Sequence, residues 1–331
     1  MKAFKIGGVK VSFVTKRQDG DKVAVLVATY NGEPYIKQQL DSILRQKDIA
    51  QYDYQIFVYD DGSKDRTLKI LKEYGSSIHI VPKDEKYQGV KSAIYSLLSK
   101  VQADYYYFSD QDDVWEPDKI QQTQLLWERF DSTIPGGVYS DLLLVDGKNR
   151  SLRNTMMSVN GWSKTERRDL SFLIFDPRVT GAALSINRAA RDFVLQMSKR
   201  EFLNVTMHDA FFALIISAFD NLAFLPKPLV RYRQHGNNQI GARRTLSQRL
   251  NIIHRISSLK NRLADILILG QLAQSLPFSV RDELKVFSEF AICRNPFKRV
   301  AIVVRNRKYW KNTSNIKLLL IIVSGVSVRR K

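Results

Sequence analysis

The sequence predicts an α/β protein in which a doubly wound, mostly parallel sheet is flanked by helices and followed by a mainly α-helical, basic extension. The sheet is predicted because short apolar runs alternate four times with stretches of helical periodicity between residues 23 and 109. Such runs are typical of strands buried on both faces, and their alternation with helices is typical of βαβ units. The extension is predicted because apolar stripes at helical spacing, interleaved with Lys and Arg, begin near residue 246.

The first part of the chain divides into regular elements. Apolar residues that recur every three or four positions, such as Ile36, Leu40 and Ile43, identify its helices. In chain order, the predicted elements are a strand at 23–28, a helix at 34–46, a strand at 55–59, a helix at 65–74, a strand at 77–81, a helix at 90–100 and a strand at 104–109. Ligands on such sheets bind beyond the carboxyl ends of the strands, so the polar residues after each strand form the candidate site.

The middle of the chain, residues 118–241, is less regular, and we expect it to complete the sheet. Its predicted elements are a helix at 119–130, a strand at 137–145, a mixed stretch at 171–186, an apolar helix at 209–219 and a strand at 222–233. Pro226 and Pro228 predict that the last strand lies at an edge or bends, because proline has no N–H to donate to a neighbouring strand.

Composition narrows the class of protein. With 331 residues, 44% apolar and 26% charged, the chain is long and apolar enough for about two globular domains. Lys and Arg exceed Asp and Glu by 52 to 33, and residues 242–331 alone hold 19 basic and four acidic residues. This imbalance predicts an anionic partner for the C-terminal part. A single cysteine, Cys293, excludes a disulfide framework, and the absence of a leader or an 18-residue apolar run predicts a cytoplasmic protein.

The strongest chemical signal follows the strand at 104–109. Asp110, Asp112 and Asp113 place three carboxylates within four residues, which is costly unless a cation neutralises them. Oxygen ligands at this density suit Mg²⁺ or Mn²⁺ bridging to a diphosphate. The alternative is a solvated acidic loop in which Asp113 caps the next helix, but the position after a buried strand favours the metal site.

A second acidic pair, Asp60 and Asp61, follows the strand at 55–59. A turn with a helix cap at Ser63 or Asp65 would account for one of these carboxylates. Two adjacent aspartates exceed that need, so we expect one of them to accept a hydrogen bond from a nucleobase or a ribose. The polar strand ends together predict that this part of the chain binds a nucleotide.

At this point the sequence resembles glycosyltransferase family 2, inverting enzymes that use nucleotide-diphospho sugars and have the glycosyltransferase-A fold, a Rossmann-like sheet flanked by helices. The resemblance covers roughly residues 22–241 and extends to bacterial rhamnosyltransferase-like polysaccharide enzymes, to which the sequence is similar. Five segments carry it in order: Val27-Ala28-Thr29-Tyr30-Asn31-Gly32, Asp60-Asp61-Gly62-Ser63, Asp110-Gln111-Asp112-Asp113-Val114-Trp115, His208-Asp209-Ala210-Phe211-Phe212 and Tyr232-Arg233-Gln234-His235-Gly236-Asn237-Asn238.

The resemblance implies a role for each matching position. The residues expected to bind the nucleotide sugar are Ala28, Thr29, Tyr30, Glu33, Asp61, Asp110 and Gln111. Asp112 and His235 are expected to bind the divalent cation, Mn²⁺ or Mg²⁺, although a lone surface histidine is the alternative for His235. The residues expected on the acceptor or sugar side are Asp113, Trp115, Gly181, His208 and Arg233, with Trp115 stacking on a sugar face. For His208 a structural role is the alternative, and Gly181 could simply mark a tight turn.

Asp209 is the expected general base. In a single displacement the acceptor hydroxyl loses its proton as it attacks the anomeric carbon, and a carboxylate within hydrogen-bond reach can take that proton. The alternative is a helix cap for the apolar stretch that follows. The implied organisation is an N-terminal extension (1–21, a short strand pair or a loose arm), a nucleotide-sugar half (22–117), an acceptor half (118–245) and a helical basic region (246–331).

The basic region is expected to bind an anionic membrane surface. Each Lys or Arg near a negative leaflet contributes about 1 kcal/mol, and Leu319, Ile321, Ile322 and Val323 would add apolar contact. No nucleic-acid readout motif is present. The alternative is that the apolar stripes bury a homodimer interface. Members of the resembled family often extend glycans on polyprenyl-diphosphate carriers, which implies a peripheral enzyme on the inner face of the cell membrane.

Together these features predict an inverting, metal-dependent glycosyltransferase of bacterial cell-surface polysaccharide biosynthesis. The expected donor is dTDP-L-rhamnose, with UDP-galactose, UDP-N-acetylglucosamine or UDP-glucose as the alternative. Two other classes are weighed: a sugar nucleotidyltransferase and a non-catalytic basic binding protein. The first would require a Gly-rich, Lys- or Arg-bearing loop after the first strand, which Asn31-Gly32-Glu33-Pro34 does not provide.

Overall fold

The computed structural model describes residues 20–162, 168–235 and 252–311, together with the short pieces 5–6, 9–10, 313, 318–319 and 322. Strands β1 (Lys5–Ile6) and β2 (Val9–Lys10) pair antiparallel in the N-terminal extension. Several positions named above lie outside the described residues: Gly236, Asn237, Asn238, Ile321 and Val323, as does the start of the apolar stripes near residue 246.

The first part of the chain forms the predicted parallel sheet. Strands β3 (Lys22–Thr29), β4 (Asp53–Asp60), β5 (His79–Ile80) and β6 (Tyr105–Asp110) are parallel and stand in the order β5-β4-β3-β6. Helices α1 (Ile36–Leu44), α2 (Thr67–Glu73), the short turn η1 (Gly75–Ser77) and α3 (Val90–Lys100) connect them. The α/β fold and its alternation of strand and helix are thus confirmed.

The second part continues the same sheet but mixes strand directions. After β6 come β10 (Leu184–Asn187), β8 (Gly137–Val145), β11 (Leu222–Arg233) and β7 (Val114–Trp115), while β9 (Ser151–Thr155) pairs with β8 alone. β10 is antiparallel to both neighbours, and β11 is parallel to β8. The predicted bend is confirmed, because the pairing register of β11 with β8 shifts at Pro228. On its other side β11 pairs with β7 only at Val230 and Arg231, so no described strand pairs with that side at the two prolines.

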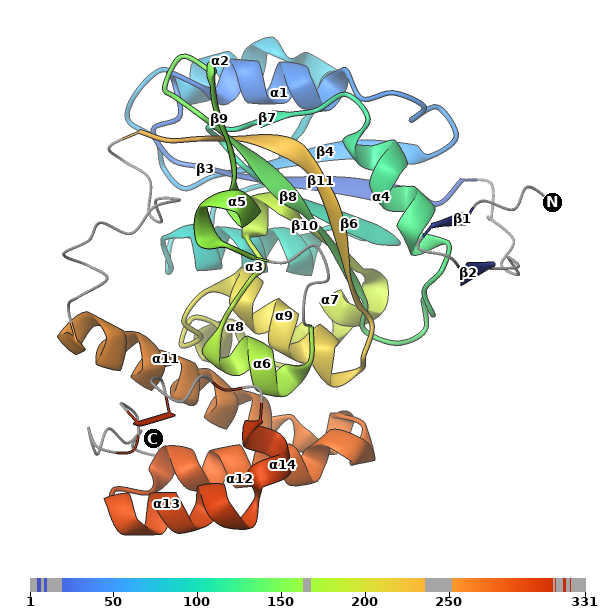
Figure 1. Cartoon of the computed structure of the whole chain (residues 1–331). Helices are drawn as coiled ribbons and strands as arrows, with labels where there is room; N and C mark the ends of the chain where they lie inside the picture. The colour runs from blue at the N-terminus through green and yellow to red at the C-terminus, as the bar shows by residue number, and fades with distance from the viewer. Residues whose placement is uncertain are drawn as a thin grey trace.

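Helices cover both faces of the sheet (Figure 1). On β3, Val23, Val25 and Val27 pack against the face covered by α1 and α2, while Ala24 and Leu26 pack against the opposite face. That opposite face is covered by α3, α6 (Leu170–Phe175), α7 (Arg188–Val194) and α9 (His208–Ala218). The remaining elements of this part are α4 (Lys119–Trp127), α5 (Met156–Asn160), η2 (Gly181–Ala183) and α8 (Lys199–Phe202).

The C-terminal region is helical and shares a hydrophobic core with α6 and α9, which cover one face of the sheet. It contains α11 (Ile252–Gln271), η3 (Ala273–Ser275), α12 (Phe278–Ile292), α13 (Pro296–Arg305) and α14 (Arg307–Trp310). Phe175 of α6 lies 5.8 Å, centroid to centroid, from both Phe287 and Trp310, which joins the two parts through aromatic packing. Among the described helices, none combines the length and the apolar composition needed to cross a bilayer.

Candidate active site

The carboxyl ends of β3, β4 and β6 meet at one edge of the sheet. Ala28 pairs with Asp110 across β3 and β6, and Thr29 pairs with Asp60 across β3 and β4. The loops beyond these strands are bonded to each other: the Asn31 N–H donates to Ser63 Oγ (2.8 Å) and the Lys64 N–H donates to Asn31 Oδ1 (2.8 Å). The polar segments that the sequence placed at separate strand ends therefore form one continuous rim.

The adjacent aspartates on β4 and after it have different environments. Asp60 accepts from the N–H groups of Gly62 and Ser63 and from the Ser63 hydroxyl, so it holds the turn. Asp61 accepts from the Gly89 N–H (2.6 Å) through Oδ2, and its Oδ1 is buried without a hydrogen-bond partner. Nearby, the Tyr30 side chain is half exposed. Asp61 thus has an unused acceptor, which fits the expected contact to a nucleoside.

Two residues expected to touch the nucleotide instead make strong contacts within the rim. The Gln111 amide accepts from the Thr29 hydroxyl (2.6 Å) and the Tyr30 N–H (2.8 Å) and donates to the Tyr30 carbonyl (3.0 Å). The Glu33 carboxylate pairs with the Arg66 guanidinium, with Oε1 2.7 Å from Nε. These contacts fix the backbone around the pocket, so Gln111 and Glu33 position the loops in this structure.

Beyond β6, Asp110, Asp112 and Asp113 form a compact carboxylate cluster. One oxygen from each lies within 4.8 Å of the others. Burial, together with the charge of Asp112, raises the pKa of Asp110 to about 7; burial and the charges of Asp110 and Asp112 raise the pKa of Asp113 well above its usual range. Asp113 Oδ2 is buried with no hydrogen-bond partner. A divalent cation would relieve this repulsion and use that oxygen, so the cluster fits Mg²⁺ or Mn²⁺.

The segment at the end of β11 closes over this cluster. His235 Nε2 lies 2.8 Å from Asp112 Oδ2, and its ring stacks on Tyr35 at 5.0 Å between centroids. Both residues were expected at the metal site, and the fold brings them into contact although they are 123 positions apart. Their binding of a cation stays a prediction.

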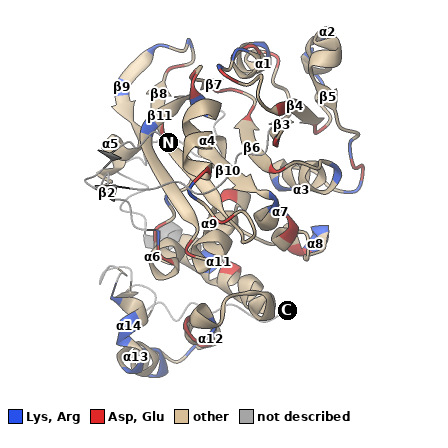
Figure 2. Cartoon of the chain, turned by 90° about the vertical axis from the view of Figure 1, so that its right-hand side faces the viewer, with Lys and Arg blue, Asp and Glu red and all other residues tan. Residues whose placement is uncertain are grey.

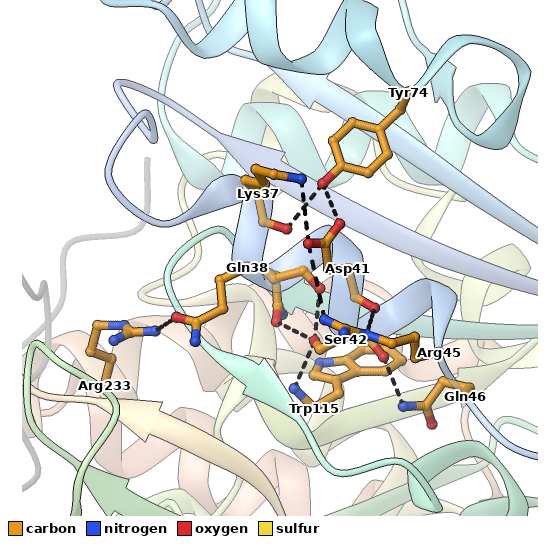
Figure 3. Close-up of polar contacts among 10 residues, drawn as sticks. Lys37, Gln38, Asp41, Ser42, Arg45, Gln46, Tyr74, Trp115 and Arg233 are labelled. Atoms are coloured by element: carbon orange, nitrogen blue, oxygen red, sulfur yellow. Dashed lines mark hydrogen bonds and ion pairs between the residues drawn. The ribbon is translucent and has the colours of Figure 1, made fainter.

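Arg233, expected on the acceptor side, is 1% exposed. Its Nε donates to the Asp112 carbonyl (2.6 Å), Nη1 to the Gly147 carbonyl (2.9 Å) and Nη2 to Gln38 Oε1 (2.6 Å). Figure 3 shows the last contact, which ties β11 to α1. The guanidinium thus holds the backbone of the carboxylate cluster in place, and burial keeps it away from an acceptor.

Trp115, expected to stack on a sugar, lies in the hydrophobic core. Trp115 lies on β7, is 2% exposed and packs near Tyr107 and beneath α1. Its backbone N–H donates to Ser42 Oγ (3.0 Å; Figure 3). The Lys119 ammonium lies 4.7 Å from the indole centroid. The apolar packing of α1 on β7 leaves no ring face open to a sugar, so Trp115 supports the cluster from below.

Asp209 lies in the first turn of α9. The helix begins at His208 and Met207 occupies the cap position, so Asp209 is not the helix cap. Its Oδ2 accepts from the Gly181 N–H (2.8 Å) and its Oδ1 from the Ala210 N–H (2.7 Å). The charge of Asp209 contributes to raising the pKa of Asp110, after burial and the charge of Asp112, which places the two carboxylates within electrostatic range.

The loop before Asp209 is held by two other parts of the chain. Lys91 of α3 donates to the carbonyls of Leu203 (2.7 Å) and Val205 (2.6 Å). Asp265 of α11 accepts from the Thr206 N–H (2.7 Å), and burial raises the pKa of this carboxyl to about 6. The helical region therefore contacts the loop that carries the candidate base.

Tyr232 is a site residue to which no role was assigned from the sequence. Burial raises the pKa of its phenol, and the charges of Asp110, Asp113, Asp112 and Asp209 add to this effect. The hydroxyl thus lies within electrostatic range of the carboxylates of both halves of the site. The signal was its place in the segment with Arg233 and His235, but only the fold brings it within range of Asp209.

Gly181 is the point where η2 approaches the candidate base. A Cβ at this position would lie 2.9 Å from His208 Nε2 and 3.6 Å from Asp209 Oδ2. We predict that Gly181→Ala lowers the transfer rate about tenfold or more, because a misplacement of about 1 Å at a reacting group can cost as much as 10²-fold. Initial rates of nucleoside diphosphate release measure the effect.

The matched control is Gly147→Ala, since a Cβ there meets no atom within 4 Å. This variant should keep the native rate and melting temperature. Equal rates for both variants would show that the space at Gly181 is not required.

Comparison with known proteins gives consistent matches. The sequence model of the family described as "Glycosyl transferase family 2" matches residues 24–190. The protein described as dTDP-rhamnosyl transferase RfbG of Shigella flexneri is 29% identical over 265 residues, which are 72% of this chain and 85% of that protein. Putative teichuronic acid biosynthesis glycosyltransferase TuaG of Bacillus subtilis is 32% identical over 111 residues, 32% of this chain and 42% of that protein.

Two solved structures share the fold. TarS of S. aureus (residues 1–349, in complex with UDP-GlcNAc) superposes with a TM-score of 0.55 at 14% identity, covering 92% of this chain and 84% of that chain. The mannosyltransferase PcManGT from Pyrobaculum calidifontis, in complex with GDP-Man and Mn²⁺, gives a TM-score of 0.50 at 17% identity, covering 92% and 87%. At these identities the likeness concerns the fold.

Proposed function

The chain belongs to glycosyltransferase family 2 and is a glycosyltransferase with a nucleotide-sugar donor. From that premise we propose that it transfers L-rhamnose from dTDP-L-rhamnose to a lipid-linked glycan. The single observation that carries the proposed transfer reaction is the placement of Asp209 within electrostatic range of the carboxylate cluster at the sheet edge. Asp209 can then act on the acceptor while the carboxylate cluster holds the departing diphosphate through a cation.

The rim and the cluster divide the donor between them. Ala28, Thr29 and Tyr30 line the nucleoside side, where Asp61 Oδ1 is the unused acceptor. Asp110, Asp112 and Asp113, with His235 beside Asp112, would hold the divalent cation at the diphosphate. When bound, such an ion neutralises negative charge on the leaving group. Arg233 and Gln111 keep the backbone of this site in position.

Asp209 acts as the general base of an inverting single displacement. Each of its oxygens accepts one backbone N–H and keeps a second lone pair for the proton of the acceptor hydroxyl. The hydroxyl oxygen attacks the anomeric carbon, the carbon–oxygen bond to the diphosphate breaks on the opposite face, and the proton passes to Asp209. Gly181 and His208 border the base and therefore lie on the acceptor side.

The donor and the acceptor are proposed from the relatives. The Shigella flexneri protein is described as a dTDP-rhamnosyl transferase, and the Bacillus subtilis protein is described in teichuronic acid biosynthesis. The first description favours dTDP-L-rhamnose as the donor, and the second favours a cell-surface polysaccharide as the product. A UDP-hexose donor is the second candidate, favoured by the shared fold with a structure that holds UDP-GlcNAc. A polyprenyl-diphosphate-linked acceptor would place the enzyme on the inner face of the cell membrane.

A donor screen tests the proposal. The protein is incubated with Mn²⁺ or Mg²⁺ and, in turn, with dTDP-L-rhamnose, UDP-galactose, UDP-N-acetylglucosamine and UDP-glucose, and release of nucleoside diphosphate is measured with and without EDTA. We expect the fastest release from dTDP-L-rhamnose and loss of release with EDTA. Faster release from a UDP-hexose would show that this sugar nucleotide, and not dTDP-L-rhamnose, is the donor. Release that EDTA leaves unchanged would contradict the metal site.

A further inference from the structure

Helix α13 presents an apolar face to solvent. Phe297, Val300 and Val304 recur at helical spacing and are all exposed, with Phe297 83% exposed. The opposite side of the helix packs inward through Ile302 and the buried Arg299, whose Nε donates to the Cys293 carbonyl (2.7 Å). α13 is therefore attached to the helical region by one set of residues, and its apolar exposed face is a different set that this attachment does not use.

The charged residues of α13 and of the chain that follows it are all basic. After Glu289 the chain contains 11 Lys and Arg residues and no Asp or Glu. Lys298, Arg305, Arg307 and Lys311 are exposed on or beside α13, and Figure 2 shows basic residues on α13 and α14. Lys308 is not counted with these four residues, because it lies within electrostatic range of the acidic Glu283. We call Phe297, Val300 and Val304, with Lys298, Arg305, Arg307 and Lys311, the α13 surface.

The apolar run at 318–323 was expected to contact lipid, but its described residues are only partly exposed. Leu318 and Ile322 pack against the core of the helical region, and only Leu319 among the described residues of this run is exposed. Two of the four residues expected to contact lipid, Ile321 and Val323, lie outside the described residues. Among the described residues, the α13 surface has three exposed apolar side chains together with basic ones, whereas the terminal run has one, Leu319.

We propose that the α13 surface docks onto an anionic lipid bilayer, with its apolar side chains at the acyl boundary and its basic side chains at the headgroups. An exposed apolar stripe rimmed by Lys and Arg is the pattern of helices that lie in a membrane interface. A second copy of this chain fits less well, because a two-fold interface through this surface would bring like charges together. Nucleic acid would use the charge but leave the aromatic and aliphatic side chains exposed.

The position of the surface suits this partner. Figure 1 places α12, α13 and α14 in a layer beyond α6, α8 and α9, away from α1 and α2. The inference adds the contact surface to the proposed membrane-side function. Vesicle binding requires neither the donor nor Asp209, so it succeeds or fails separately from the proposed reaction.

The test is co-sedimentation of the full chain with vesicles of phosphatidylcholine alone or mixed with phosphatidylglycerol. We expect binding to the anionic vesicles, weakened by salt because the contribution of the basic residues is screened. Phe297→Ser/Val304→Ser and Lys298→Glu/Arg305→Glu should each lower the partition coefficient about tenfold or more. Melting temperature checks that the variants are folded.

Phe278→Ser is the matched control. Phe278 is 82% exposed, as Phe297 is 83% exposed, but it begins α12 at the end opposite to α13. It should bind anionic vesicles like the native chain. Equal binding to neutral and anionic vesicles, or folded surface variants that bind like the native chain, would overturn the proposal. So would variants that convert an oligomer into a monomer while vesicle binding stays unchanged, since that outcome assigns the surface to a second copy.

Discussion

Replacing Asp209 with asparagine is expected to lower the rate of sugar transfer by about 10²–10⁴-fold, the range that general-base catalysis contributes. Asparagine keeps one oxygen that can accept the Gly181 N–H, but its NH2 group cannot accept from the Ala210 N–H. The melting temperature is therefore measured beside the rate, to separate a loss of catalysis from a loss of stability. The amide has no basic oxygen for the proton of the acceptor hydroxyl, so the loss should fall on kcat. Transfer rates with saturating donor and acceptor measure it, and calorimetric titration with the nucleoside diphosphate should give an unchanged affinity.

The control lies at the other end of the same helix. Asp220 is exposed, follows α9 and has a φ of 52°, a backbone conformation that asparagine tolerates well. Asp220→Asn should therefore keep both the native rate and the native stability. A native rate in Asp209→Asn would remove Asp209 from the mechanism, and an equal loss in both variants would indicate a general effect on the helix.

Replacing Asp112 with asparagine is expected to lower turnover about 10²-fold or more and to raise the Mn²⁺ concentration needed for half-maximal rate. A neutral amide oxygen is a weaker ligand for a hard cation than a carboxylate. A cation at the leaving group supplies several kcal/mol of charge stabilisation, and each 1.36 kcal/mol is about a tenfold change in rate. Release of nucleoside diphosphate as a function of Mn²⁺, with an EDTA end point, measures both effects.

Asp118→Asn is the control for this change. Asp118 lies six positions after Asp112 and pairs with Lys227 at the surface, a contact of the kind that contributes about 0–1 kcal/mol. It should leave the rate and the Mn²⁺ dependence unchanged. If Asp112→Asn also leaves both unchanged, Asp112 does not bind the metal, and the cluster needs a different explanation for its repelling carboxylates.

Much of the parallel part of the fold could be predicted from local sequence. The run at 23–28 is apolar throughout because β3 is buried on both faces, and the helix at 90–100 matches α3 at both ends. β5 is shorter than the predicted strand at 77–81, because it lies at the edge of the sheet and pairs on one side only. The antiparallel insertion of β10 between β6 and β8 left no local signal.

The candidate site divides in the same way. Asp110, Asp112 and Asp61 follow strands whose ends were predictable, so their gathering at one edge was predictable as well. Gln111 and Glu33 were expected to face the nucleotide, but their partners, Tyr30 and Arg66, are 81 and 33 positions away. Which way such a side chain points depends on what the fold places beside it, and sequence spacing carries no such information.

The sequence by itself determined the family, the order of the strands' polar ends and the charge imbalance of the C-terminal region, because motifs, apolar runs and charge counts are local properties. The tertiary structure alone decided that Trp115 and Arg233 are buried supports, that Tyr232 lies within electrostatic range of the carboxylates, and that α13 has an exposed apolar face. The physical reason is that burial is set by packing between distant segments, such as Arg233 on the Asp112 carbonyl, 121 positions apart.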